Sequence, residues 1–258
     1  MNKMNKKILF HISFLAGLLA LLASPCLAAD VSINLDPSVI NISAFYNGSS
    51  VKLSGTIPAK AEAFIRLSGL KREIHLKKKG KVAGILWMNT GDVTFNDVPD
   101  TYILLTSSGL KDEIDSPQSS LGFTALEKQI DVEPADSDKS FLIREFVKLQ
   151  KKNLVYASDA DAVQYATAAG GLRTFTAVAT IPPKMKPGTY TIEVFALENG
   201  AVTGTATKTL TVKETGFPKQ LSNLAFNHSL LYGIMAVLVA LVAGLITGVL
   251  FKGKGGVH

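Results

Sequence analysis

The sequence predicts a mainly β protein: an immunoglobulin-like sandwich with a helical insertion, followed by one membrane-spanning helix. Three observations predict this class. Short segments at both ends of the central region alternate apolar and polar residues, as half-buried strands do. Between them, about residues 116–169, the apolar spacing is typical of a helix. Near the C-terminus, the 21 uncharged residues 230–250 are long enough to cross a bilayer as a helix.

The N-terminus has the layout of a secretory signal peptide. Three lysines in the first seven residues precede an apolar stretch at 8–22, and small residues follow at 24–29. We expect cleavage after Ala28, so that residues 1–28 form the signal peptide; the alternative is an uncleaved N-terminal anchor. Pro25 argues against lipoprotein processing at Cys26. Cleavage after Ala28 would remove this only cysteine, and disulfide or thiol chemistry with it.

The two ends together predict a single-pass protein of a bacterial inner membrane. Residues 29–226 would form a periplasmic domain, 230–250 the transmembrane helix and 251–258 a cytoplasmic tail. Lys252 and Lys254 follow the span, as the positive-inside rule expects. Once the signal's three lysines are removed from the 27 basic residues, 24 face 21 acidic ones. This near balance of basic and acidic residues does not indicate nucleic-acid binding.

The early strands follow from alternation. Residues 50–57 place Val51, Leu53 and Ile57 on one face and polar side chains on the other, and residues 63–67 repeat the pattern. Apolar runs of strand length follow at 82–88 and 102–106. We expect the only tryptophan, Trp87, to pack in the core.

The late strands are predicted at 175–181, 189–197 and 201–212. Glu198-Asn199-Gly200 separates the last two, which is a strong hairpin signal. Tyr190 is either a tyrosine corner, whose hydroxyl binds backbone upstream, or an ordinary strand aromatic. Phe195 and Leu197 make the second face of this strand apolar. We expect the helical insertion to cover that face; the alternative is a partner protein.

The insertion contains one clear amphipathic helix. Its apolar stripe consists of Leu142, Ile143, Phe146, Val147 and Leu149, and lysines occupy its last turn, where they suit the helix dipole. A second short helix is predicted over Ala160–Ala169.

The search for catalytic chemistry gives no candidate. The sequence contains no phosphate-binding loop, zinc-protease motif or nucleophile elbow. The acidic clusters are typical of solvated loops and helix N-termini; they are Asp131, Glu133, Asp136 and Asp138, then Asp159 and Asp161. We therefore expect no catalytic residue, metal site or cofactor, and a protein that is not an enzyme.

A basic segment at 71–81 is the strongest surface candidate. Its basic residues are Lys71, Arg72, Lys77, Lys78, Lys79 and Lys81. They could contact an anionic ligand or phospholipid headgroups near the membrane. The alternative is a solvated hairpin whose charges protect an edge strand.

Small residues line one face of the predicted span. Ala236, Ala240, Gly244 and Gly248 lie four apart, a spacing that lets another helix approach closely. This row predicts contact with an integral-membrane partner or self-association, in addition to the lipid bilayer. The alternative is the ordinary richness of membrane helices in Ala and Gly.

Several segments carry a family resemblance: residues 80–89, residues 93–102, Pro187-Gly-Thr-Tyr190 and Leu231-Tyr-Gly233. Together they resemble the putative transmembrane protein family first described from alphaproteobacteria. The resemblance implies an accessory role beside a membrane exporter of the sulfite and organosulfonate type, and it supplies no active-site residues.

The sequence thus favours a membrane-anchored periplasmic binding or interaction module. The alternatives are an envelope structural protein and a hydrolase that uses carboxylates.

Overall fold

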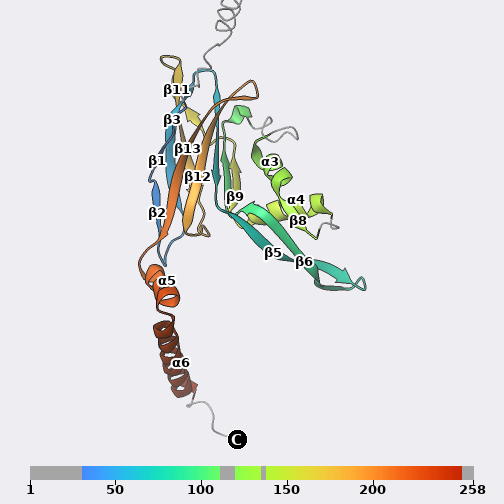
Figure 1. Cartoon of the computed structure of the whole chain (residues 1–258), viewed down its shortest axis with the longest axis vertical. Helices are drawn as coiled ribbons and strands as arrows, with labels where there is room; N and C mark the ends of the chain where they lie inside the picture. The colour runs from blue at the N-terminus through green and yellow to red at the C-terminus, as the bar shows by residue number, and fades with distance from the viewer. Residues whose placement is uncertain (1–30, 111–119, 135–137, 252–258) are drawn as a thin grey trace, which may run out of the picture.

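The computed structural model describes residues 31–110, 120–134 and 138–251. Most strands form two facing sheets, and a third sheet projects from them on one side (Figure 1). The first sheet has the order β1 (Asn34–Asp36), β3 (Ser49–Pro58), β11 (Leu172–Ile181) and β10 (Gln164–Tyr165). The second has the order β2 (Val39–Ile42), β13 (Ala201–Glu214), β12 (Gly188–Glu198), β4 (Glu62–Ser68), β7 (Tyr102–Leu105) and β9 (Tyr156–Asp159). The third consists of β5 (Lys71–Val82), β6 (Leu86–Pro99) and β8 (Asp131–Glu133).

The first core lies between the two facing sheets. On β3 the predicted alternation is confirmed, because Val51, Leu53 and Ile57 are fully buried while Lys52 is exposed. β11 pairs antiparallel with β3 along its whole length and adds its own alternate residues to the same core. The mainly β fold with a C-terminal apolar helix is therefore confirmed, while its assignment as immunoglobulin-like stays a prediction.

Strand β12 contributes to two cores, one on each face. Ile192 and Val194 are fully buried in the first core. Leu197 is buried in a second core, and Phe195 packs against it with its ring 5.8 Å from that of Phe64. The second core also holds apolar residues of the insertion, Phe146 among them. The insertion therefore covers the second face of β12, as the sequence predicted.

The described part of the insertion contains the helices α3 (Gly122–Gln129) and α4 (Lys139–Lys152). Asp138 caps α4 by accepting a hydrogen bond from the Phe141 N–H at 3.1 Å, and the last turn carries lysines, as expected. Four residues of the predicted stripe are buried, but Leu149 is 39% exposed. The sequence did not single out α3.

The second predicted helix, Ala160–Ala169, is wrong. In its place, β10 pairs with Phe175 and Thr176 of β11, and Ala169 bridges to Leu172. The Tyr165 hydroxyl also accepts a hydrogen bond from the Ala63 N–H at 2.8 Å. Pairing with β11 and the contact with the distant Ala63 outweigh the local helical propensity of an alanine-rich segment.

Tyr190 forms the bond expected of a tyrosine corner. Its side chain is 2% exposed, and its hydroxyl donates to the Lys186 carbonyl at 2.7 Å. Burial raises the pKa of Tyr190 to about 12. Of the two sequence interpretations, the tyrosine corner is the one the structure bears out.

After β13 the chain continues into two helices, α5 (Phe217–Asn227) and α6 (Ser229–Phe251). A hydrogen bond of 2.9 Å from the Ser222 hydroxyl to the Glu214 carboxylate joins α5 to the end of β13. α6 has 23 residues, its most apolar stretch of 18 residues has a mean hydropathy of 2.8, and the helix is long and apolar enough to cross a membrane. Within the described chain, no residue of α6 is buried.

Candidate functional site

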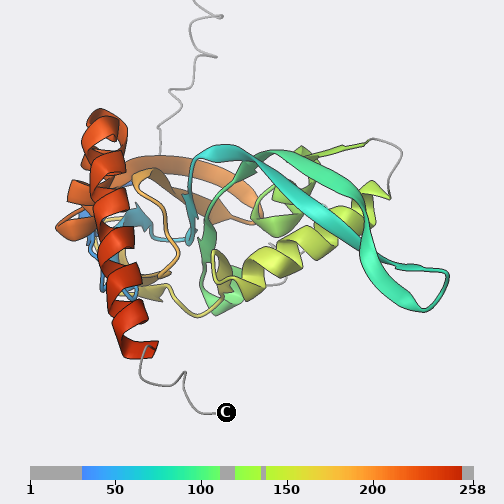
Figure 2. The same ribbon diagram turned by 90° about the horizontal axis from the view of Figure 1, so that it is seen from below.

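The most exposed feature of the domain is the hairpin of β5 and β6. Its strands pair antiparallel from Lys71 opposite Pro99 to Val82 opposite Leu86. Only the base is attached: Val93 and Phe95 are buried in the second core, and β8 pairs with residues 94–96. Seen from below, the hairpin extends past α4 and away from the facing sheets (Figure 2).

We call residues Lys77–Asp92 the arm. Every residue of the arm is exposed except the half-buried Gly80. At its end the chain turns through Ala83 and Gly84, both with positive φ (53° and 74°), and the Ile85 N–H donates to the Val82 carbonyl at 3.3 Å. Two consecutive positive φ values suit the twist of a tight hairpin. The predicted single strand at 82–88 is therefore wrong, because the turn divides it.

We call the apolar residues around this turn the tip. They are Val82, Ile85, Leu86, Trp87 and Met88, and their exposed fractions are 45%, 86%, 61%, 66% and 47%. The prediction that Trp87 packs in the core is wrong. The sequence shows an apolar run here but not that the run lies beyond the reach of either core. An Ala-Gly pair at 83–84 was the available signal for a turn.

The six basic residues of the predicted cluster do not form one site. Arg72 lies at the base, where its Nε donates to the buried Asp100 carboxylate at 2.9 Å, and Lys71 lines a cleft nearby. The other four lie on the arm. Lys77 pairs with Asp92, and the Lys81 ammonium lies 5.5 Å from the centre of the Trp87 ring. The arm therefore carries four lysines and one acid, a strongly basic balance.

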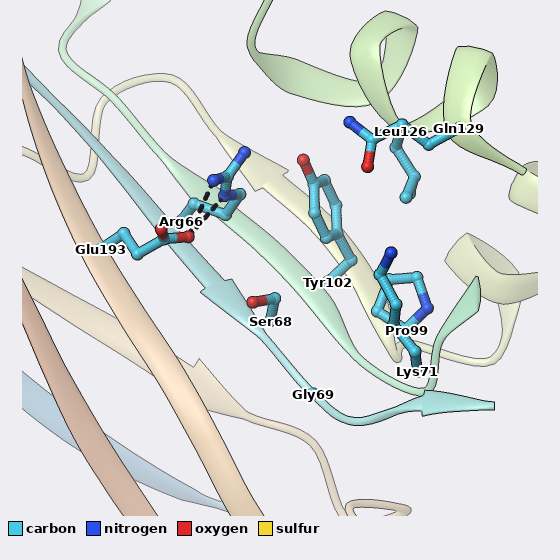
Figure 3. Close-up of a pocket in the computed structure, with 9 residues that line it drawn as sticks. All are labelled: Arg66, Ser68, Gly69, Lys71, Pro99, Tyr102, Leu126, Gln129 and Glu193. Carbon is cyan, nitrogen blue, oxygen red and sulfur yellow. Dashed lines mark hydrogen bonds and ion pairs between the residues drawn. The ribbon is translucent and has the colours of Figure 1, made fainter. Parts of the chain in front are cut away.

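A cleft of about 190 Å³ lies at the base of the hairpin (Figure 3). We call it the basal cleft. Its residues come from β4, the start of β5, the end of β6, β7, α3 and β12, and they are Arg66, Ser68, Gly69, Lys71, Pro99, Tyr102, Leu126, Gln129 and Glu193. Of these residues, only Lys71 belongs to the basic segment predicted from the sequence, because residues from six elements converge here and no local motif marks them.

The strongest interaction in the basal cleft is an ion pair. The Arg66 guanidinium donates to the Glu193 carboxylate at 2.8–2.9 Å and lies 4.9 Å from the centre of the Phe195 ring. Burial alone would lower the pKa of Arg66, but its hydrogen bond with Glu193 and the nearby Tyr102 more than offset this and raise it. Burial raises the pKa of Tyr102, whose hydroxyl donates to the Gly122 carbonyl. The ion pair joins β4 to β12, and the Tyr102 hydroxyl joins β7 to α3.

An apolar groove of about 270 Å³ separates the base of the arm from α4. It is lined by Leu76, Val93, Phe95, Leu142, Phe146 and Leu149, with Lys77, Lys78 and Glu145 at its rim. Phe95 stacks on Phe146 at 4.4 Å between ring centres. The groove is thus the open margin of the second core.

Three carboxylates of the predicted acidic clusters make structural contacts. Asp131 pairs with Lys139 at 3.1 Å, and this contact lowers the pKa of Asp131. Asp138 caps α4, and Asp159 accepts from the Asp161 N–H at 3.1 Å. Asp136 lies outside the described residues. Within the described ranges, no three His, Cys, Asp or Glu residues are grouped so that they could hold a metal ion.

The predicted row of small residues lies on α6 and is open. Ala236, Ala240, Gly244 and Gly248 are all exposed. A methyl group placed on Gly244 or Gly248 would have no neighbour within 4 Å among the described residues. The first 30 residues and the tail after Phe251, where the signal peptide and cytoplasmic segment are predicted, lie outside the described chain.

Comparison with known protein families agrees with the family resemblance found in the sequence. No curated protein matches the chain. One family model matches residues 30–253, which include the β domain, both C-terminal helices and the arm. The chain therefore belongs to the family described as "Putative transmembrane protein (Alph_Pro_TM)".

Proposed function

We propose that this protein is a membrane-anchored interaction module without enzymatic activity. Its β domain would lie on the periplasmic side of a bacterial inner membrane, with α6 as the single span. The observation that carries the proposal is the arm, a basic projection with an apolar end, on a domain that is joined through α5 to an apolar helix. The structural roles of the carboxylates named above support a non-enzymatic function.

The proposed partner is an integral-membrane protein that contacts α6. The open row of small residues supports this, because close helix approach in lipid depends on small side chains. An exporter would be one such partner, as the family resemblance implies. Self-association through the same row is the alternative within this proposal.

The test is co-purification of the full chain after gentle detergent extraction. We expect a membrane protein, or a second copy of this chain, to accompany the wild type. Ala240→Leu with Gly244→Leu would abolish the association by filling the row. Val242→Leu with Val249→Leu provides the matched control, because these residues lie on the opposite face of α6 and are 55% and 73% exposed.

A chain that always emerges alone and monomeric would contradict the proposal. If both double variants lose the co-purifying protein equally, the small residues of α6 are not the contact surface. The proposed orientation predicts that a cysteine introduced at Val178, which is 54% exposed on β11, reacts with a membrane-impermeant reagent in cells with a permeabilised outer membrane. Labelling only after disruption of the inner membrane would overturn the orientation.

A further inference from the structure

The tip is a cluster of large apolar side chains at the far end of the arm. Among the described residues, the apolar contacts of the hairpin are made at its base, through Ile74, Leu76, Val93 and Phe95. Ile85 and Trp87 are 86% and 66% exposed. Single exposed apolar residues are ordinary, but several together mark a surface that is covered by something else.

The lysines of the arm indicate what covers the tip. Lys77, Lys78, Lys79 and Lys81 follow one another within a few positions of the turn, with Asp92 as the only acid of the arm. Aromatic and aliphatic side chains bounded by lysines are typical of segments that lie at the boundary of headgroups and acyl chains. The long lysine stems can lie along apolar surface while the ammonium groups reach lipid phosphates.

The position of the arm also supports contact with a lipid surface. In Figure 1 the arm slopes toward the end of the domain from which α5 and α6 leave, and Figure 2 shows the arm and α6 on opposite sides of the domain. Helix α5, which precedes α6, also exposes apolar side chains, with Phe217 at 67% and Phe226 at 86%. Because α6 holds the domain at a membrane, the tip meets a bilayer surface at high effective concentration.

We infer that the tip is a second membrane contact, which inserts shallowly into an anionic phospholipid surface while the arm lysines bind the headgroups. The insertion is shallow because the hairpin has only two strands along the arm, and their outer edges carry unpaired N–H and C=O groups, which hydrocarbon does not tolerate. The inference rests on the proposed function only in placing the domain at a membrane. It adds that lipid itself is the ligand of the arm.

Trp87 makes the inference directly testable, because it is the only tryptophan of the chain. The full chain is reconstituted in vesicles of phosphatidylcholine alone or mixed with phosphatidylglycerol. We expect Trp87 emission to shift to shorter wavelength with phosphatidylglycerol. Lipids brominated near the headgroup should quench it more strongly than lipids brominated at the chain ends.

Two variants separate the roles of charge and apolar surface. Lys77→Gln, Lys78→Gln and Lys79→Gln should weaken the docked state by roughly fivefold per lysine and remove the dependence on phosphatidylglycerol. Lys81 is kept because it lies over the Trp87 ring. Changing the exposed Lys52, Lys60 and Lys213 of the sandwich to Gln is the matched control and should have no effect. Ile85→Ser with Leu86→Ser should reduce quenching in both lipid mixtures.

The inference is overturned if Trp87 is equally accessible to acrylamide in both lipid mixtures and unaffected by brominated lipid. It is also overturned if Trp87 becomes protected only when a co-purified membrane protein is present in the vesicles. The second result would still support the proposed function. If no membrane protein or second copy co-purifies but brominated lipid still quenches Trp87, the proposed function is overturned and the lipid contact is supported.

Discussion

The hairpins β12–β13 and β5–β6 have turns with the same backbone conformation, but their apolar residues lie in different places. Each turns through two consecutive residues with positive φ, Asn199 and Gly200 in one and Ala83 and Gly84 in the other. Strand β12 packs its apolar residues in two cores and the turn after it is polar, although Val202 of β13 is 45% exposed. β5–β6 buries only its base and ends in the tip.

The comparison shows that a tight turn of this kind does not require apolar side chains around it. The apolar residues of β12 are accounted for by packing within the chain. Those of the tip are not, so their role is sought outside the folded domain. The following predictions test whether this division between folding and contact residues holds.

The largest effect is expected where the hairpin base meets α4. Phe146 is 1% exposed and stacks on Phe95 of β6, so Phe146→Ala should lower the free energy of unfolding by about 3–5 kcal/mol. Urea denaturation of the full chain in detergent, followed by circular dichroism, measures this. Phe141→Ala on the same helix is the control; Phe141 is 48% exposed, and the cost should stay below about 1 kcal/mol. Equal costs would show that the base is not anchored by the second core.

A smaller loss is expected in the first core, where the same substitution can be made at a buried and an exposed strand position. Val194 on β12 is fully buried and Val178 on β11 is 54% exposed. Val194→Ala should cost about 2–3 kcal/mol, through lost transfer free energy and a residual cavity. Val178→Ala should change the unfolding free energy by about 0.5 kcal/mol or less. A similar cost at both positions would contradict the assignment of faces.

The two hairpins also show what the sequence could and could not predict. β12–β13 was predicted nearly to the residue, because alternation and Asn199-Gly200 are local signals. The membrane helix was predicted as 230–250 and is observed as Ser229–Phe251, because length and apolarity suffice to identify it. The helix α4 could also be predicted, because its amphipathic stripe is a local sequence pattern.

The tip was misplaced for a physical reason. The apolar run 82–88 has the composition of a buried strand, and only the tertiary structure shows that no second sheet covers it within the described part of the chain. The basal cleft was missed because Arg66, Tyr102 and Glu193 come from three separate strands. The false helix at 160–169 arose because local propensity was not weighed against pairing with β11.

The tyrosine corner predicts an effect of about 1 kcal/mol, which is the usual value of one hydrogen bond. Tyr190→Phe should lower the unfolding free energy by this amount near pH 8 through loss of the bond to the Lys186 carbonyl. Tyr46→Phe is the control, since the Tyr46 hydroxyl lies 3.4 Å from the Ser49 hydroxyl in an exposed contact. If the two variants have the same free energy of unfolding, the tyrosine corner does not stabilise β12.

The same residue gives a pH dependence. The folded pKa of Tyr190 is raised to about 12, and an unfolded tyrosine titrates near 10. The unfolded state therefore loses this proton first, so the stability contributed by neutral Tyr190 is complete below about pH 10 and is lost as the pH rises toward about 12. Denaturation curves across this range should show a shallower alkaline fall for Tyr190→Phe than for the wild type. Parallel curves would contradict the assignment.

The smallest effect is expected at the tip, and it decides the comparison. Leu86 is 61% exposed near the end of one hairpin, and Leu197 is 4% exposed near the end of the other. Leu86→Ser should change the free energy of unfolding by about 0.5 kcal/mol or less. Leu197→Ser should cost at least about 3 kcal/mol, because it leaves a cavity and buries a hydroxyl. The measurement is urea denaturation in detergent, where no bilayer surface is present.

A large cost for Leu86→Ser in detergent would mean that the tip packs within the folded chain, and the division between folding and contact residues would fail. A negligible cost has the opposite meaning when it is combined with reduced lipid quenching in vesicles. It would show that Leu86 contributes to a contact outside the chain and not to the fold. The apolar tip would then be maintained for its ligand, in the same protein whose strand β12 packs its apolar residues in the two cores.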